Sequence, residues 1–423
     1  MFSSARFRRL KLISTVKMRK SVILLMSVLA LTSTFFSLEL VFEERNQIAN
    51  GYGDFIIFYT GAQILRDGLG PDLYDLSVQK LYQSKFNVPI RLGPLPYNHP
   101  PFELLWHVPL TYLPYVSAYL VWTAINVIFL GILYRLFGLQ ENKDIASMFF
   151  FMVLGFYPVT VALLHGQDSI LLCLLLTGAF IMLKERKETV AGVFVALALI
   201  KPQFAVPAMT VLFVRPYSSA VKAFLITGSI LLVVSILIVG SGGAQKYIYL
   251  LETTDRLNYT IAPQNMPNIR GLVYSVFHEG NPRLVLPMVM LLTLGILGLV
   301  FTCWRKISWH TEQSFELRLA LTITLTLLAS YHCYAHDLSL LLVPAVLIAK
   351  SLLKQTSKWS INQWLLIGAL LTLWVPFPLT YGPLLSNERF AWGGLFLIAF
   401  TILLSVELKR TSQTAIAGET FHE

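Results

Sequence analysis

The chain has 423 residues, of which 55% are hydrophobic and only 13% are charged. Soluble globular domains carry about 25% charged residues, so this composition excludes an ordinary soluble protein. The formal net charge is +10, but seven of the 33 Lys and Arg precede residue 21, and most of the others lie between apolar runs. That distribution is typical of membrane insertion, whereas nucleic-acid binding would need a basic face with interleaved aromatic residues. We therefore predict an all-α polytopic membrane protein that binds no nucleic acid.

Apolar runs recur along most of the chain, and a helix needs about 20 such residues to cross a bilayer. They predict a bundle of about 10–12 transmembrane or half-membrane helices, some of which extend into their flanks. In chain order the runs cover residues 21–40, 116–137, 145–163, 169–184, 189–200, 203–214, 219–240, 284–303, 317–331, 338–353, 362–379 and 391–407. Two segments, 42–101 and 241–283, stand outside this pattern because they are long, polar and rich in Pro, Gly, Asn and Tyr.

Residues 189–214 are apolar except for an interruption at Lys201-Pro202. This stretch is either one kinked crossing or two half-helices that enter the membrane and return. A return places most Lys and Arg on the side of the N-terminus, which the positive-inside rule favours. We therefore adopt the return and expect segments 42–101 and 241–283 to be external loops.

This topology implies a single transmembrane domain over residues 21–407. A basic tail, residues 1–20, and a C-terminal tail, residues 408–423, are then both cytoplasmic, and the protein belongs in the inner or plasma membrane. Polar residues gather on the external face, where His99 ends the first loop, whereas the cytoplasmic connections are short and basic. We therefore expect an active site on the external face.

Asp54 opens a segment, residues 55–66, whose apolar positions follow helical spacing. Such an amphipathic helix suits the membrane interface. Asp54 is either the N-cap of this helix or a general base that an acceptor on the water side can reach. The two interpretations are compatible, since a cap would also hold the carboxylate in place.

Lys201 stands in the middle of apolar sequence. A lysine there is costly unless it reaches water or an anion. It either snorkels from a helix end to the interface or binds an anionic ligand such as a lipid phosphate, which the free amides of a half-helix would also attract.

Two further polar stretches are candidates for ligand binding. The turn His165-Gly-Gln-Asp168 contains Gln167, and it is typical of an ordinary polar turn with Asp168 as the N-cap of the next helix. Asn268 and Arg270 lie in the second long segment, where they suit binding of phosphate or sugar hydroxyls. A plain solvated loop explains them equally well.

His332, His336 and Asp337 lie in a third polar turn. Two His at i, i+4 beside an Asp could bind a metal, but no further ligand follows at a fixed spacing and HExxH is absent, so we predict no metal. An imidazolium that contacts a leaving phosphate suits this position better, and interfacial anchoring is the alternative. The three cysteines show no CxxC spacing, and no Walker A, GxSxG or GxGxxG motif is present, so we predict no cofactor.

Several short stretches, spread over about residues 50–345, occur in a distinctive order. They are Gly53-Asp-Phe55, Gly68 with Tyr74-Asp75, Tyr97-Asn-His-Pro-Pro-Phe102, Gly166-Gln167, Ala191-Gly192 before Lys201-Pro202, Asn268 to Gly271, and His336-Asp-Leu-Ser-Leu340. Their order and shared face resemble the GT-C superfamily of membrane glycosyltransferases, and within it glycosyltransferase family 87, the polyprenol-phosphate-mannose-dependent mannosyltransferases. One departure is Ser169, where family members often show Asn.

The resemblance implies a GT-C-like fold and an enzyme that moves a hexose, with mannose as the first expectation. The donor would be a polyprenyl-phosphate-linked sugar in the membrane lipid, and the acceptor a hydroxyl of an external glycolipid or glycan. Asp54 would deprotonate this hydroxyl, which then attacks the anomeric carbon with inversion. No cofactor would be needed. The resemblance assigns donor phosphate or sugar binding to Lys201, Arg270, His336, His332, Asn268, Gln167 and His99.

A polytopic transporter or lipid flippase is the alternative, because broken helices such as that at Lys201-Pro202 often mark transport sites. Against it, the two halves of the chain show no inverted repeat, and the polar residues gather on one face. A structural assembly factor of the envelope would leave Asp54 and Lys201 without a purpose. We therefore expect a glycosyltransferase.

Overall fold

The computed structural model describes residues 2–51, 53–86, 95–139, 143–214, 217–256, 263–305, 312–355, 358–375, 379 and 391–419. Every regular element in these ranges is a helix, with no strand among them, so the predicted all-α class is confirmed. Five helices of the described residues are long and apolar enough to cross a membrane: Met18–Ala49, Tyr115–Leu136, Ser218–Thr253, Pro282–Arg305 and Trp392–Gln413. Shorter apolar helices accompany them, as expected for a multi-pass membrane protein.

The elements follow one another along the chain with short connections. They are α1 (Phe2–Ala49), α2 (Phe55–Arg66), η1 (Gly70–Asp72), α3 (Leu76–Gln83), η2 (Pro101–Trp106), η3 (Val108–Tyr112), α4 (Tyr115–Leu136), α5 (Lys143–Leu154), α6 (Tyr157–Leu164), α7 (Ser169–Lys184), α8 (Glu188–Leu197), η5 (Ala198–Ile200), α9 (Pro202–Val214), α10 (Ser218–Arg256), η6 (Pro263–Asn265), α11 (Ile269–Phe277), η7 (Pro282–Leu284), α12 (Val285–Arg305), α13 (Glu312–Ala329), η8 (Asp337–Leu341), α14 (Leu342–Lys354), α15 (Ile361–Leu373) and α17 (Trp392–Glu419).

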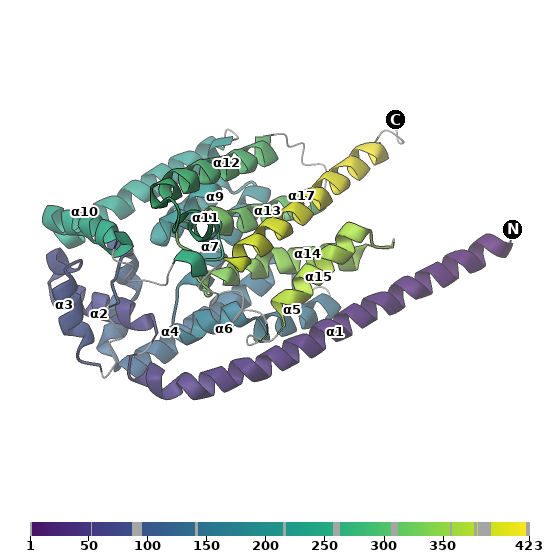
Figure 1. Ribbon diagram of the computed structural model, residues 1–423. Helices are drawn as coiled ribbons and strands as arrows, with labels where there is room; N and C mark the ends of the chain where they lie inside the picture. The colour runs from purple at the N-terminus through teal and green to yellow at the C-terminus, as the bar shows by residue number, and fades with distance from the viewer. Residues whose placement is uncertain are drawn as a thin grey trace.

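The two ends of the bundle differ in what they hold. Helix α1 lies along one side of the molecule, and its start points toward the same end as the last turns of α17 (Figure 1). Helices α2 and α3 and the last part of α10 lie at the opposite end (Figure 1). The first polar segment therefore folds away from the two chain termini.

The apolar run at 145–163, which predicts one helix, is split into α5 and α6. The break comes at Gly155, where a Cβ would stand 2.4 Å from the carbonyl oxygen of Ala30 in α1. Only glycine lets the two backbones approach so closely. Pro158 then stands in the first turn of α6, a position that suits its missing amide. The split directs the end of α6 toward the start of α2.

Helix α2 is an interior helix, so its predicted place at the membrane interface is wrong. All residues from Phe55 to Ala62 are buried. The rest of the first polar segment folds over it, and the Tyr59 hydroxyl donates to the carbonyl oxygen of Leu113 at 2.8 Å. Where it is described, segment 42–101 is largely helical and packed rather than an open loop.

Helix α10 is longer than its apolar run predicts. It bends at Gly240, whose φ of 67° glycine adopts without strain, and continues to Arg256. Lys246 after the bend pairs with Asp72 at 2.6 Å. The end of α10 is thereby joined to the first polar segment.

The predicted break at Lys201-Pro202 is present. Helix α8 and η5 end at Ile200, and α9 begins at Pro202, which has no amide to continue the preceding helical turn. Helix α8 packs mainly on α7 and α10, whereas α9 packs on α12 and α13. Lys201 therefore stands at a junction between helices, close to the starts of α7 and η8.

Candidate active site

Asp54 is placed by a close approach between the start of α2 and the turn after α6. The backbone amide of Phe55 donates to the carbonyl oxygen of His165 at 2.7 Å. Gly166 has a φ of +63°, and a Cβ there would stand 2.6 Å from Cβ of Phe55, so a larger residue would force the segments apart. The Asp54 carboxylate makes no capping hydrogen bond to α2, a helix whose residues are all described, and the predicted N-cap contact is wrong.

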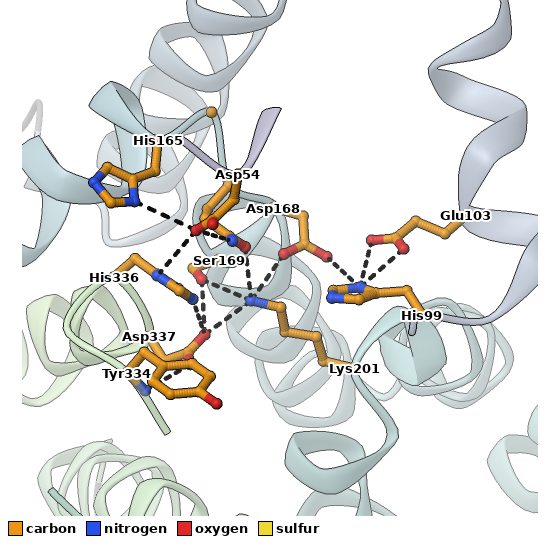
Figure 2. A network of polar contacts seen from close by, with 12 residues as sticks. Asp54, His99, Glu103, His165, Asp168, Ser169, Lys201, Tyr334, His336 and Asp337 are labelled. Atoms are coloured by element: carbon orange, nitrogen blue, oxygen red, sulfur yellow. Dashed lines mark hydrogen bonds and ion pairs between the residues drawn. The ribbon is translucent and has the colours of Figure 1, made fainter. Parts of the chain in front are cut away.

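The Asp54 carboxylate instead faces side chains from two other segments (Figure 2). Gln167 Nε2 donates to Oδ2 of Asp54 at 2.6 Å. Nδ1 of His165 lies 3.3 Å from the same oxygen, and Nδ1 of His336 lies 3.9 Å from it. The Asp54 side chain is still 27% exposed. It is therefore a carboxylate held by neighbouring groups that a ligand can still reach.

Lys201 forms a buried cluster beside Asp54 (Figure 2). Its Nζ lies 2.9 Å from Asp168 and 2.8 Å from Asp337, and it also donates to Ser169 Oγ at 3.0 Å and Gln167 Oε1 at 3.3 Å. The Lys201 side chain is only 5% exposed. Snorkelling to water is therefore excluded as its explanation. Two carboxylates, and not a lipid phosphate, surround the ammonium, as a buried charge requires.

Asp168 and Asp337 stand at the starts of two apolar elements. Asp168 precedes α7 but makes no capping hydrogen bond to that fully described helix, so its predicted cap is also wrong. Oδ1 of Asp337 accepts from Ser169 at 2.9 Å, and Oδ2 accepts from the backbone amide of Tyr334 at 3.0 Å. Sequence reasoning named both acids but did not pair them with Lys201. The usable signal was that a buried lysine requires a buried acid.

A third group extends this cluster through Asp168. Nδ1 of His99 lies 2.9 Å from Glu103 and 4.0 Å from Asp168, and the hydroxyl of Tyr97 donates to Glu103 at 3.1 Å. His99, Glu103 and Asp168 offer one donor atom each within 4.8 Å, a spacing that would admit a metal ion. Asp168 already pairs with Lys201 and Glu103 with His99, so the charges balance without a metal, and we assign none.

Arg270 and His332 form a pair on the other side of Tyr334. Nη1 of Arg270 is 3.3 Å from the His332 ring nitrogens, and its guanidinium lies 4.0 Å from the centre of the Tyr331 ring. The Tyr334 ring contacts both His332 and His336, with centroid separations of 6.1 and 5.8 Å. Aromatic rings thus connect the Arg270 pair to the surroundings of Asp54.

Asn268 is buried and is the N-cap of α11. Its Oδ1 accepts from the amide of Gly271 at 2.9 Å, and its Nδ2 donates to the carbonyl oxygen of Ser330 at 2.8 Å. Both ends of the side-chain amide are used by the backbone. Asn268 therefore fastens the start of α11, and with it Arg270, to the end of α13.

Burial and neighbouring charge determine which groups are ionised. Burial raises the pKa of Asp54, but the hydrogen bond and charge of His165 outweigh it and hold this pKa below its ordinary value. Burial lowers the pKa of His165, yet its bond to Asp54 outweighs burial and raises it. Burial lowers the pKa of His336 to about 4. At neutral pH Asp54 is ionised and His336 is neutral, so the expected imidazolium at His336 is not supported.

Burial raises the pKa of Glu103 well above its ordinary value, and the charge of Asp168 raises it further. Burial also lowers the pKa of His99 to about 4. Glu103 is therefore protonated and His99 neutral at neutral pH. This branch of the cluster adds hydrogen bonds without adding a second exposed carboxylate beside Asp54.

A multi-pass helical membrane protein with an ionised, reachable carboxylate surrounded by fixed donors has the makings of a membrane enzyme. The sequence model of glycosyltransferase family 87 matches residues 97–330, more than half of the chain. The chain belongs to glycosyltransferase family 87, as the order of its motifs predicts, and it is therefore a membrane glycosyltransferase. This membership decides against the transporter and flippase alternative. No curated protein and no solved structure matches the chain. Lys201 and Arg270 lie within the matched residues, whereas Asp54 and His336 lie outside them.

Proposed function

We propose that the protein transfers a hexose, with mannose as the first candidate, from a polyprenyl-phosphate sugar to a hydroxyl of an external glycolipid or glycan. Asp54 is the general base of this reaction. The observation that carries the proposal is the state of its carboxylate, which is held by Gln167 at 2.6 Å and remains 27% exposed. A general base must be ionised and within reach of the proton that it removes, and Asp54 meets both conditions.

The reaction is a single displacement. Asp54 takes the proton of the acceptor hydroxyl while the acceptor oxygen forms a bond to the anomeric carbon. The bond from that carbon to the phosphate oxygen breaks, and its electron pair leaves with the polyprenyl phosphate. Attack from the face opposite the phosphate inverts the anomeric centre. A single reachable carboxylate suits this scheme, because a retaining mechanism would need a nucleophile as well as an acid–base group.

We assign the contact with the leaving phosphate to Arg270 rather than Lys201. Lys201 is enclosed by Asp168 and Asp337, so its charge is already balanced. The guanidinium of Arg270 is held at the edge of the site by Tyr331 and His332. A guanidinium matches phosphate geometry with two parallel donors, and charge placed in advance where it develops is the main source of rate in such sites.

The membrane setting supports a lipid-linked donor. The residues of the site stand in turns or at helix starts, outside the five long apolar helices. A donor whose tail lies in the bilayer presents its sugar phosphate at that depth, and the sequence has no nucleotide-phosphate motif. The positive-inside distribution of Lys and Arg supports the external face for this site, with both termini in the cytoplasm.

The test uses purified protein reconstituted in lipid vesicles that contain a glycolipid and glycan extract of the source membranes as the acceptor pool. Labelled mannose is supplied either as polyprenyl-phosphate-mannose or as a nucleotide sugar. We expect transfer only from the lipid donor, with an inverted linkage in the product. Transfer from the nucleotide sugar alone would contradict the proposed donor class. Transfer from another polyprenyl-phosphate hexose, but not from mannose, would correct the sugar and keep the class.

A further inference from the structure

Gln167 stands between a cation and an anion. Its Nε2 donates to Asp54 at 2.6 Å, and its Oε1 accepts from Nζ of Lys201 at 3.3 Å. An ammonium can only donate hydrogen bonds, and an ionised carboxylate can only accept them. The amide can therefore satisfy both neighbours in one orientation alone. Lys201 selects the orientation that turns the amide NH₂ toward Asp54.

Lys201 is itself fixed from several directions. Its ammonium has three hydrogens, and four acceptors surround it: Asp168, Asp337, Ser169 and Gln167. These acceptors belong to the turn before α7, to the first turn of α7 and to the start of η8. A group held in this way cannot also turn toward a donor phosphate without breaking the cluster. Its one contact toward the exposed carboxylate of Asp54 is through Gln167.

We propose that Lys201 is a positioning residue that acts through Gln167 to hold the Asp54 carboxylate in the ionised and correctly oriented form that proton removal requires. This inference rests on the proposed role of Asp54. It differs from a purely structural role because it predicts a change in chemistry at Asp54 even in variants that fold normally.

The expected change is in proton affinity and in position. A hydrogen bond donated to the ionised form of an acid lowers its pKa, so loss of the Gln167 bond raises the pKa of Asp54. The other groups that face Asp54 are unchanged in the variants: His165 after α6, His336 before η8 and, through longer-range charge effects, Tyr115 and His99. A shift in the titration of Asp54 can thus be traced to the amide.

The kinetic test is a double-mutant cycle of the wild type, Lys201→Met, Gln167→Met and the double variant. We expect each single variant to lower kcat about a hundredfold, the scale of a small misplacement of a reacting group, with little change in the KM for the donor. The double variant should be no slower than the singles, because both changes break the same connection. Multiplying effects, or a raised donor KM with an unchanged kcat, would overturn the proposal.

Lys201→Met leaves Asp168 and Asp337 without their cation, and this variant can fail to fold. Gln167→Glu avoids that problem, since Lys201 keeps all its partners. The new carboxylate then stands against Asp54 where 2.6 Å separates the two side chains now, and the pair must share a proton. The acid limb of kcat/KM should move to higher pH. Lys350→Met is the matched control, because it removes a lysine paired with Glu316 at 2.7 Å on α14, and it should keep the wild-type kcat.

A measurement without substrate separates this inference from the proposed reaction. A carbodiimide labels a carboxyl group only in its protonated form, and mass spectrometry reports labelling of Asp54 as a function of pH. We expect the midpoint to lie at higher pH in Gln167→Glu and Lys201→Met than in the wild type. An unchanged midpoint would refute the inference whatever the transfer assay shows. A shifted midpoint in a protein that does not use the lipid donor would refute the donor assignment and leave the role of Lys201 standing.

Discussion

The backbone amide of Phe55 donates to the carbonyl oxygen of His165 at 2.7 Å, which places Asp54 beside His165 although 111 residues separate them in the chain. The bond joins the first turn of α2 to the turn between α6 and α7. It also explains why glycines occur at positions 53 and 166, where both residues have positive φ. The carboxylate of Asp54 therefore belongs chemically to the turn after α6.

Replacing His165 by Phe should move the acid limb of kcat/KM to higher pH. His165 lowers the pKa of Asp54, so its removal raises that pKa, and a base that must be ionised then fails at a higher pH. In the wild type, the limb that belongs to Asp54 should lie below the ordinary value of 3.8. The pH profile of His278→Phe, a change on the separate helix α11, serves as the control. Identical profiles for His165→Phe and the wild type would show that His165 does not act on Asp54.

Replacing Arg270 by Met should weaken donor binding. A charged hydrogen bond is worth about 1.5–3 kcal/mol, so kcat/KM for the lipid donor should fall roughly ten- to a hundredfold. Most of the loss should appear in KM if the phosphate is bound in the ground state, and in kcat if contact tightens only as charge develops. Arg283→Met, at an exposed arginine of η7, is the matched control. A normal kcat/KM in Arg270→Met would remove Arg270 from the donor site.

Replacing Asn268 by Ala should reduce stability. The variant loses the cap of α11 and leaves the Ser330 carbonyl without its side-chain donor, at a cost of about 1–3 kcal/mol. Thermal unfolding in detergent should show a lower midpoint, and Asn268→Asp should lie between the two because it keeps the acceptor for Gly271. Wild-type stability together with a raised donor KM would instead make Asn268 a sugar contact.

Chelation of divalent cations should leave transfer unchanged. In the group His99, Glu103 and Asp168, hydrogen bonds and the Lys201 ammonium already balance the charges. The assay is transfer after EDTA treatment, with and without added Mg²⁺ or Mn²⁺. A loss that Mn²⁺ restores in the wild type but not in Glu103→Gln would place a cation in this group.

The sequence predicted the helical class and most apolar helices, because membrane-spanning runs are long and unambiguous. It missed the split between α5 and α6, where Gly155 answers to a backbone contact with α1 that no local pattern reveals. It also placed α2 at an interface, because an apolar stripe indicates that a face is covered but not what covers it.

The candidate residues were predicted by chemical type more reliably than by partner. Asp54, Gln167, Lys201, His99 and His336 do lie in one connected network. Their connections could not be predicted, because Asp168 and Asp337 reach Lys201 only through the packing of α7, α9 and η8. Both acids were explained locally, one as a cap and the other as a neighbour of histidines. A buried charge is a long-range constraint, and local motifs do not express it.

The measurement that tests the account most directly is transfer of labelled mannose from polyprenyl-phosphate-mannose by Asp54→Asn, compared with the wild type and with Asp67→Asn at the other end of α2. The amide has nearly the same shape but cannot accept the acceptor proton, so transfer should fall about a hundred- to ten-thousandfold. Asp67→Asn should transfer at the wild-type rate, because Asp67 pairs with Tyr82 and Arg66 away from the site. Equal transfer by Asp54→Asn and the wild type would contradict the assignment of Asp54 as the base.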